Sequence, residues 1–199
     1  LFRSLSAYAA CGYRHYLERV VGLPRAEDGP AAAGAGGLDA RSRGTLVHAL
    51  LEEVDFAAPA PPSADRVLAL AAGQGAAPGT DEVAGVVALT GAVARSPLCD
   101  RLAGARTVRR EEPFAFALDA VSPVLNGILD VLAEEDDGAL LVVDYKTNRV
   151  AEADLERLVE GDYGAQRRLY ALAALEAGAP RVEVAYVFLE RPAEPVTRT

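Results

Sequence analysis

The sequence predicts an α/β fold with a central mixed β-sheet of about four or five strands, flanked by helices, and a mainly helical N-terminal half. Two patterns carry this prediction. Apolar side chains recur at helical spacing in residues 1–107, and β-branched and aromatic runs of strand length follow in residues 108–199. With 199 residues, 51% of them hydrophobic, the chain can bury a core as a single domain. We expect it to be a fragment of a longer protein, because it lacks methionine and stops just after an apolar run.

The helical half contains five predicted helices and two loops of small residues. The helices are expected at residues 4–23, 41–56, 65–74, 81–95 and 97–103, where apolar residues lie three and four positions apart. Alanine, proline and glycine dominate residues 24–40 and 57–62, which leaves few bulky side chains for packing. We therefore expect these two segments to be flexible loops.

The second half contains the predicted sheet. Strands are expected around residues 114–116, 121–132, 140–144 and 182–189, and a helical stretch at 151–177, broken at Gly161, precedes the last of them. Three consecutive strands, a helical crossover and a fourth strand are typical of a mixed sheet with helices packed against it.

Composition excludes several classes of protein. The formal net charge of −9 provides no overall positive field, so a nucleic acid would need a local patch, a metal ion or a larger surrounding protein. The two cysteines, Cys11 and Cys99, have no CxxC partner, which argues against a disulfide framework and a zinc knuckle. No window approaches the roughly 18 uninterrupted apolar residues of a membrane span. We expect a soluble, cytoplasmic protein.

Two predicted strands carry an aspartate among apolar residues, which is costly unless the charge is paired or bound to a metal. Asp144 and Lys146 are two positions apart and therefore project from one face of their strand, with Tyr145 on the other. A three-residue turn at 136–138 would pair Asp130 with Asp144, whereas a two-residue turn would place Asp130 opposite Tyr145 and split the group across the sheet. We favour the three-residue turn, because its last residue is glycine.

Two carboxylates and a lysine on one sheet are suited to a magnesium-dependent phosphodiesterase. Magnesium prefers oxygen ligands and bridges carboxylates to phosphate oxygens, and a lysine can stabilise the charge that develops during hydrolysis. The alternative is an ion pair between Asp144 and Lys146 on an exposed strand edge, the commoner case for an isolated Asp-x-Lys pattern.

Further motifs favour the nuclease interpretation. They are RGTLVHALLE at 43–52, EEPF at 111–114, GILD at 127–130, DYKT at 144–147, and Gln166 with Tyr170. With these motifs in this order, the sequence resembles the RecB-like nuclease domain of the PD-(D/E)xK superfamily. The segment 4–17 also resembles the family's opening helix, with Gly12 in place of a proline. The resemblance implies a restriction-endonuclease-like core in residues 108–199.

The resemblance also implies roles for individual residues. Asp130, Asp144 and Lys146 would be catalytic, and a divalent cation would be held by His48, Asp130, Asp144 and the backbone carbonyl of Tyr145. Three further residues would support the site or contact DNA, namely Glu111, Gln166 and Tyr170. Glu112 is an alternative to Glu111, Tyr170 is expected mainly to pack, and Glu52 is expected to be a solvated helix charge.

The implied activity is that of an Mg²⁺- or Mn²⁺-dependent deoxyribonuclease. An exonuclease is favoured, acting on single-stranded DNA beside helicase motor domains in bacterial DNA end processing and repair. Some relatives carry an iron–sulfur cluster, but the cysteine triplet that follows their last strand has no counterpart here. Two alternatives remain: a stand-alone exonuclease of the CRISPR-adaptation type, and a non-catalytic DNA-binding or scaffold domain that retains the fold.

Overall fold

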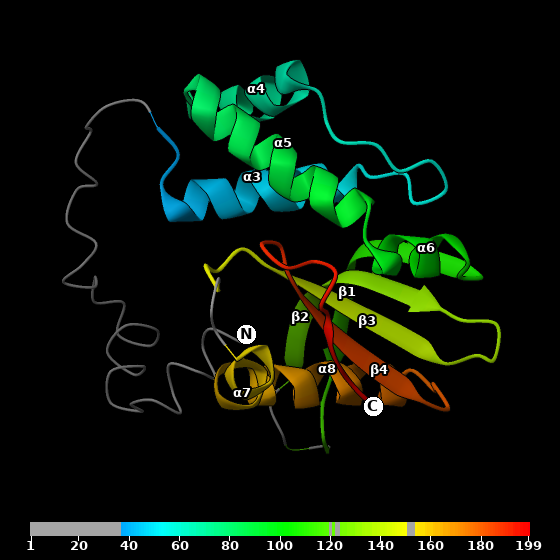
Figure 1. Ribbon diagram of the computed structural model, residues 1–199. Helices are drawn as coiled ribbons and strands as arrows, with labels where there is room; N and C mark the ends of the chain where they lie inside the picture. Colours follow the sequence, from blue (N-terminus) through cyan, green and yellow to red (C-terminus); the bar gives the residue numbers. More distant parts are fainter. Residues whose placement is uncertain (1–36, 120, 122–123, 151–153) are drawn as a thin grey trace. The chain divides into compact units, whose positions relative to one another are not determined.

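The computed structural model describes residues 37–119, 121, 124–150 and 154–199 (Figure 1). Two compact units are distinguished, and residues 115–127 belong to the first of them together with residues 1–35. The second unit, residues 36–114 and 128–199, contains the described helices, most of the sheet and the candidate site. The predicted helix 4–23, most of the predicted loop 24–40 and Cys11 lie outside the described residues.

Four helices in the first half match the prediction closely. They are α3 (Ala40–Glu52), α4 (Ala64–Gly73), α5 (Thr80–Ala94) and α6 (Pro97–Ala103). The largest difference concerns α3, which ends four residues before the predicted boundary at Phe56. Val54 and Phe56 are buried but lie beyond the helix, so their apolar character reflects core packing and not helical periodicity. Residues 57–62 contain no regular structure beyond a turn, as predicted.

One hydrophobic core joins these helices to one face of the sheet. Leu46, Val47, Leu50 and Leu51 of α3 are at most 2% exposed, and they belong to the same buried cluster as alternate residues of three strands. The N-terminus of α3 is capped by Asp39, whose carboxylate accepts the backbone N–H of Ser42 at 2.6 Å. Core packing and capping together fix the position of α3 against the sheet.

Within the described residues, no single helix has the length and apolar character of a membrane span. Helices α5 and α6 reach that size only when they are taken together, and they meet at a bend of 57°.

The sheet has five strands in the order β1-β2-β3-β4-β5. They are β1 (Thr107–Phe116), β2 (Leu125–Glu134), β3 (Leu140–Lys146), β4 (Val182–Phe188) and β5 (Val196–Arg198). The β3–β4 pair is parallel, whereas β2–β3 and β4–β5 are antiparallel. The predicted mixed sheet is thereby confirmed. The three-residue strand β5 was not predicted, and β1 begins seven residues before the predicted strand at Phe114.

The hairpin between β2 and β3 adopts the favoured register. Val131 pairs with Val143 and Glu134 with Leu140, which is the register that a three-residue turn gives, and the described pairing stops one position before Asp130 and Asp144. Gly138 closes the turn with φ +80°, a left-handed conformation that suits glycine. The prediction of a three-residue turn was correct.

The crossover from β3 to β4 is helical but is not broken at Gly161. Helix α7 (Leu155–Leu158) leads into the π-helical turn η2 (Val159–Tyr163), which continues directly into α8 (Gly164–Glu176). Gly161 is accommodated by the wider π turn, so the predicted break is wrong. Helix α8 contacts β3 and β4 on the face opposite α3 and α5, which gives the sheet a helical layer on each side (Figure 1).

Candidate functional site

Strand β3 divides its side chains between the two layers, as its alternation predicts. Tyr145 is buried in the cluster formed with α3–α6. Asp144 and Lys146 face the other way, where they contact Gln166 of α8. Asp144 is only 3% exposed, so the alternative of an ion pair on an exposed strand edge is wrong.

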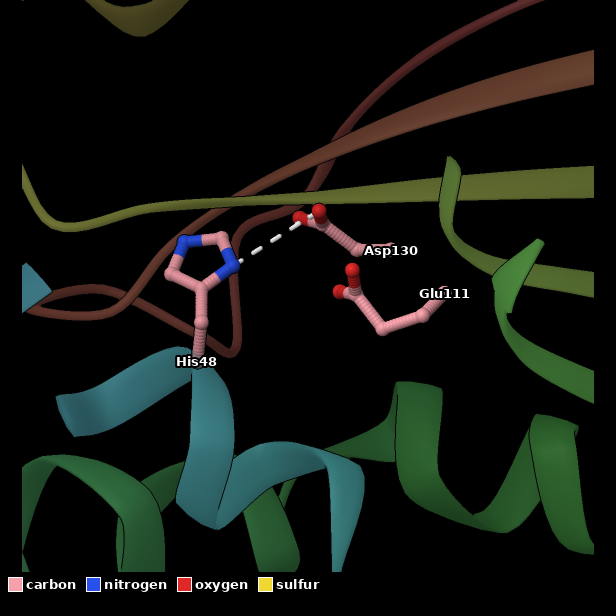
Figure 2. Close-up of side chains that lie close together, drawn as sticks. All are labelled: His48, Glu111 and Asp130. Carbon is pink, nitrogen blue, oxygen red and sulfur yellow. Dashed lines mark ion pairs between the residues drawn. The ribbon is translucent and has the colours of Figure 1, made fainter. Parts of the chain in front are cut away.

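One cluster of possible metal ligands joins three elements that are far apart in sequence. His48 of α3, Glu111 of β1 and Asp130 of β2 point toward one another (Figure 2), and one ligand atom from each lies within 4.8 Å of the others. His48 Nδ1 lies 3.6 Å from Asp130 Oδ1. The other carboxylate oxygen of Asp130 accepts the backbone N–H of Tyr145 at 2.7 Å. Two carboxylates and an imidazole form a donor set that fits Mg²⁺ or Mn²⁺.

Glu111 reaches this cluster through an unusual backbone conformation. Its φ of 47° is left-handed, and it is the only positive φ at a non-glycine position among the described residues. Such a conformation is unfavourable for an L-residue with a side chain and is often found at functional sites. Glu112, the alternative considered in the sequence, forms an ion pair with Arg109 at 2.7 Å. The structure therefore assigns Glu111 and not Glu112 to the cluster.

Negative charges are concentrated in the cluster. Burial lowers the pKa of His48, but Asp130, Asp144 and Glu111 outweigh burial and raise that pKa above its ordinary value. Burial first, and then the charges of Asp130 and Glu52, raise the pKa of Glu111. The neighbouring carboxylates contribute to both shifts, and such a group of negative charges favours a cation.

A second group of polar residues surrounds Asp144. Its Oδ1 accepts hydrogen bonds from Gln166 Nε2 and Tyr170 Oη, each at 3.1 Å, while its Oδ2 forms an ion pair with Lys146. Gln166 Oε1 accepts a hydrogen bond from Lys146 Nζ at 3.0 Å, so this one amide contacts both ends of the ion pair. Tyr170 was expected mainly to pack, but its hydroxyl takes part in this network.

The charges of the two groups influence each other. Burial raises the pKa of Asp144, the Lys146 charge opposes this increase, and the Asp130 charge adds to it. The sequence grouped Asp144 with His48 and Asp130, whereas the structure brings Glu111 to those two residues and directs Asp144 toward Lys146 and α8. Alternation of side chains predicts the face on which Asp144 lies, but it does not predict which partners occupy its oxygens.

Two tyrosines beside Lys146 were not singled out in the sequence. The ring centroids of Tyr163 and Tyr186 lie 4.3 and 5.5 Å from Lys146 Nζ. Tyr163 precedes Gln166 by three positions, so helical spacing could have indicated it. A compositional signal was also present, because Lys146 is the only lysine in the sequence and every other basic residue except two histidines is arginine.

Comparison with known proteins relates these observations to a family. The model of the PD-(D/E)XK nuclease superfamily matches residues 2–198. The chain is 33% identical over 177 residues to an ATP-dependent helicase/nuclease subunit from Desulforudis audaxviator, in an alignment that covers 78% of this chain and 14% of that protein. It is 36% identical over 131 residues to the subunit of the same name from Heliobacterium modesticaldum, covering 56% of this chain and 9% of that protein.

The chain therefore spans only a small part of the relatives that it matches. Among solved structures, one described as the crystal structure of SSO0001 gives a TM-score of 0.37 at 15% identity, covering 79% of this chain and 74% of that chain.

Proposed function

Because this chain belongs to the PD-(D/E)XK nuclease superfamily, we propose that it is the metal-dependent nuclease domain of a helicase–nuclease that hydrolyses phosphodiester bonds in DNA. One observation carries the proposal. The ligand cluster of His48, Glu111 and Asp130 lies beside a buried ion pair between Asp144 and Lys146. Asp130 is on β2 and the ion pair is on β3, and these are neighbouring strands of a restriction-endonuclease-like sheet.

The cation would be held by His48, Asp130 and Glu111, with Asp144 and the Tyr145 carbonyl as the further ligands that the family resemblance implies. When bound, a divalent cation supplies Lewis-acid charge to a phosphate group. His48 must be neutral to act as a ligand, and the raised pKa of its imidazole means that protons compete with the cation there.

Lys146 is the residue proposed to act on the substrate itself. Its side chain is 13% exposed, so it is largely but not completely desolvated. A partly desolvated cation stabilises the charge that develops on a phosphate more strongly than a cation in water. Gln166 and Tyr170 hold Asp144, and Gln166 also accepts a hydrogen bond from Lys146, so these two residues orient the ion pair.

The proposed substrate is single-stranded DNA, and the proposed partners are the helicase motor domains of the same or an associated polypeptide. A division of DNA binding between this domain and a motor is consistent with the net charge of −9, since a motor could supply the positive surface that this domain lacks. The relatives named above are described as subunits of ATP-dependent helicase/nucleases. We propose Mg²⁺ or Mn²⁺ as cofactor, exonuclease action and a cytoplasmic, nucleoid-associated location.

The test combines cleavage with metal binding. The 199-residue chain is incubated with end-labelled single-stranded DNA and Mn²⁺ or Mg²⁺, beside Asp130→Asn, Lys146→Ala and an EDTA control. We expect metal-dependent cleavage that both variants lose, whereas calorimetric Mn²⁺ binding is lost only in Asp130→Asn. Glu112→Gln is the matched control, because Glu112 pairs with Arg109 outside the cluster.

Other outcomes separate the alternatives. Metal binding without cleavage would indicate a domain that needs its motor, and addition of helicase domains should then restore cutting. Absence of both cleavage and metal binding would overturn the proposal and favour a non-catalytic DNA-binding or scaffold domain.

A further inference from the structure

We propose that Tyr163 and Tyr186 are positioning residues that hold the Lys146 ammonium against the faces of their rings and thereby set its orientation for catalysis. This inference rests on the proposed function of Lys146 and extends it to two residues that the sequence analysis did not single out.

The Lys146 ammonium is surrounded by one carboxylate, one amide and two aromatic rings. Asp144 pairs with Lys146 on one side, and Gln166 Oε1 accepts a hydrogen bond at 3.0 Å. The face of Tyr163 lies 4.3 Å away, and that of Tyr186 lies 5.5 Å away. Both separations are within the range in which an aromatic face attracts a cation. The rings therefore occupy space that would otherwise be open to water or to other rotamers of the lysine.

Two features of the fold fix the rings, and the first is the position of Tyr186. Tyr186 is completely buried in β4 and lies opposite Asp144 in the parallel register. Its hydroxyl donates to the backbone carbonyl of Tyr163 at 3.3 Å, and the two rings stack with centroids 5.4 Å apart and planes inclined by 27°. Tyr186 thus supports Tyr163, which is the ring closer to the ammonium.

The π-helical turn η2 supplies the second means of support. Tyr163 is its last residue, and α8 begins immediately after it with Gln166 one turn further on. Tyr163, Gln166 and Tyr170 are spaced by three and four positions, so all three side chains share one side of the helix. Local π-helical turns occur frequently at functional sites. Here the turn delivers an aromatic ring to the same ion pair that Gln166 and Tyr170 contact.

The physical effect of the rings is to hold the charge without neutralising it. A carboxylate that pairs with the ammonium competes with a phosphate for it, whereas an aromatic face attracts the cation weakly and carries no net charge. The rings therefore restrict the lysine and leave its charge available to the substrate.

The position of the ammonium can be measured without reference to activity, because Lys146 is the only lysine in the sequence. Biosynthetic ¹³C-lysine labelling gives one Cε–Hε signal, which stacking against Tyr163 should move upfield of the signal of a solvent-exposed lysine. We expect Tyr163→Leu to return the signal toward that of exposed lysine and Tyr163→Phe to leave it shifted, since phenylalanine retains the ring.

Kinetics give the second readout. With saturating Mn²⁺ and single-stranded DNA, Tyr163→Leu should lower kcat by about ten- to thirtyfold with KM little changed, because a desolvated cation–π contact is of that strength. Tyr163→Phe should restore activity to within about twofold of wild type. Asp162→Asn, at an exposed neighbour in η2, controls for disturbance of the turn and should match the wild type.

The outcomes distinguish this inference from the proposed function. If the lysine signal is unchanged in Tyr163→Leu, or if Tyr163→Phe is as impaired as Tyr163→Leu, the positioning role is overturned even when the wild type cleaves DNA. If the wild type neither cleaves DNA nor binds Mn²⁺, the proposed function fails while the lysine signal still tests the aromatic contact. Tyr186→Phe keeps the second ring and removes only its bond to the Tyr163 carbonyl, and a smaller upfield shift is expected.

Discussion

The carboxylate of Asp130 accepts the backbone N–H of Tyr145 at 2.7 Å, just beyond the last described pair between β2 and β3. One side chain thus contributes to the ligand cluster and also ties β2 to the C-terminal end of β3. Tyr145 stands between Asp144 and Lys146 in the chain, so this bond fixes the cluster relative to the strand that carries the ion pair. The two functions of Asp130 can be separated by substitution.

Asp130→Asn retains an oxygen for the Tyr145 N–H, whereas Asp130→Ala leaves that donor without its partner. We expect both variants to lose Mn²⁺ binding in titration calorimetry, because each removes the carboxylate charge. In urea unfolding, Asp130→Ala should be less stable than Asp130→Asn by about 1–2 kcal/mol. Equal stability of the two variants would show that the bond to Tyr145 contributes nothing to the fold.

Gln166 should be more sensitive to substitution than its neutral side chain suggests. It is 5% exposed and hydrogen-bonds Asp144, Lys146 and Tyr170, so Gln166→Leu leaves buried polar groups without a partner. We expect a loss of about 1–3 kcal/mol in the free energy of unfolding and a lower kcat. Arg168→Ala, at an exposed position on the same helix, should change stability by less than about 0.5 kcal/mol.

The raised pKa of Glu111 predicts that, without metal, the stability of the wild type relative to Glu111→Gln depends on pH. Burial first, and then the charges of Asp130 and Glu52, disfavour its deprotonated form in the fold. The wild type therefore has a lower free energy of unfolding at pH values above the raised pKa, and this destabilisation disappears as the pH falls below the ordinary value of 4.5.

Glu111→Gln removes the charge at every pH. In EDTA at pH 8 its melting temperature should exceed that of the wild type by about 1–2 °C, a small value because solvent partly screens this incompletely buried group. The two proteins should melt together near pH 4. Glu112→Gln, which breaks an ion pair with Arg109, is the control and should not gain stability at pH 8.

The left-handed backbone at Glu111 gives a separate prediction from the same position. Glu111→Gly and Glu111→Ala both remove the carboxylate, but only glycine tolerates a φ of 47° without a steric cost. Chemical denaturation should therefore find the glycine variant more stable than the alanine variant by about 1 kcal/mol. The opposite order would mean that residue 111 relaxes out of this conformation.

Gly138 provides a test of the turn that sets the register between β2 and β3. Because its φ is +80°, Gly138→Ala should destabilise the protein by about 1 kcal/mol. Gly104 has a φ of −85°, and a Cβ there would lie 3.7 Å from its nearest neighbours. Gly104→Ala should therefore be neutral or stabilising by up to about 1 kcal/mol in the same unfolding assay.

Local sequence signals predicted the elements that local physics determines. The turn at 136–138 ends in glycine, and this alone favoured the register that the sheet adopts. Apolar spacing predicted α4, α5 and α6 as helices whose ends differ from those observed by at most one residue. The face on which Asp144 and Lys146 project followed from strand alternation.

Other features depend on long-range contacts that no local pattern encodes. The positive φ of Glu111 rotates its side chain toward His48, and nothing in the EEPF segment distinguishes that glutamate from the next one. The stacking of Tyr186 on Tyr163 depends on the pairing of β4 with β3 and on a π-helical turn in place of the predicted break at Gly161. Strand β5 is too short for its pattern to be informative.

The elements that supply His48, Glu111 and Asp130 are far apart in the sequence, and this separation affects the order of folding. Residues 48 and 111 are 63 positions apart in the chain, since 111 − 48 = 63, whereas the β2–β3 hairpin closes over a turn of three residues. Contacts between distant segments form after local ones because of the entropy lost in closing a long loop. We expect the hairpin to form early and the ligand cluster late. Substitutions at the cluster should therefore change the unfolding rate while leaving the refolding rate nearly unaltered.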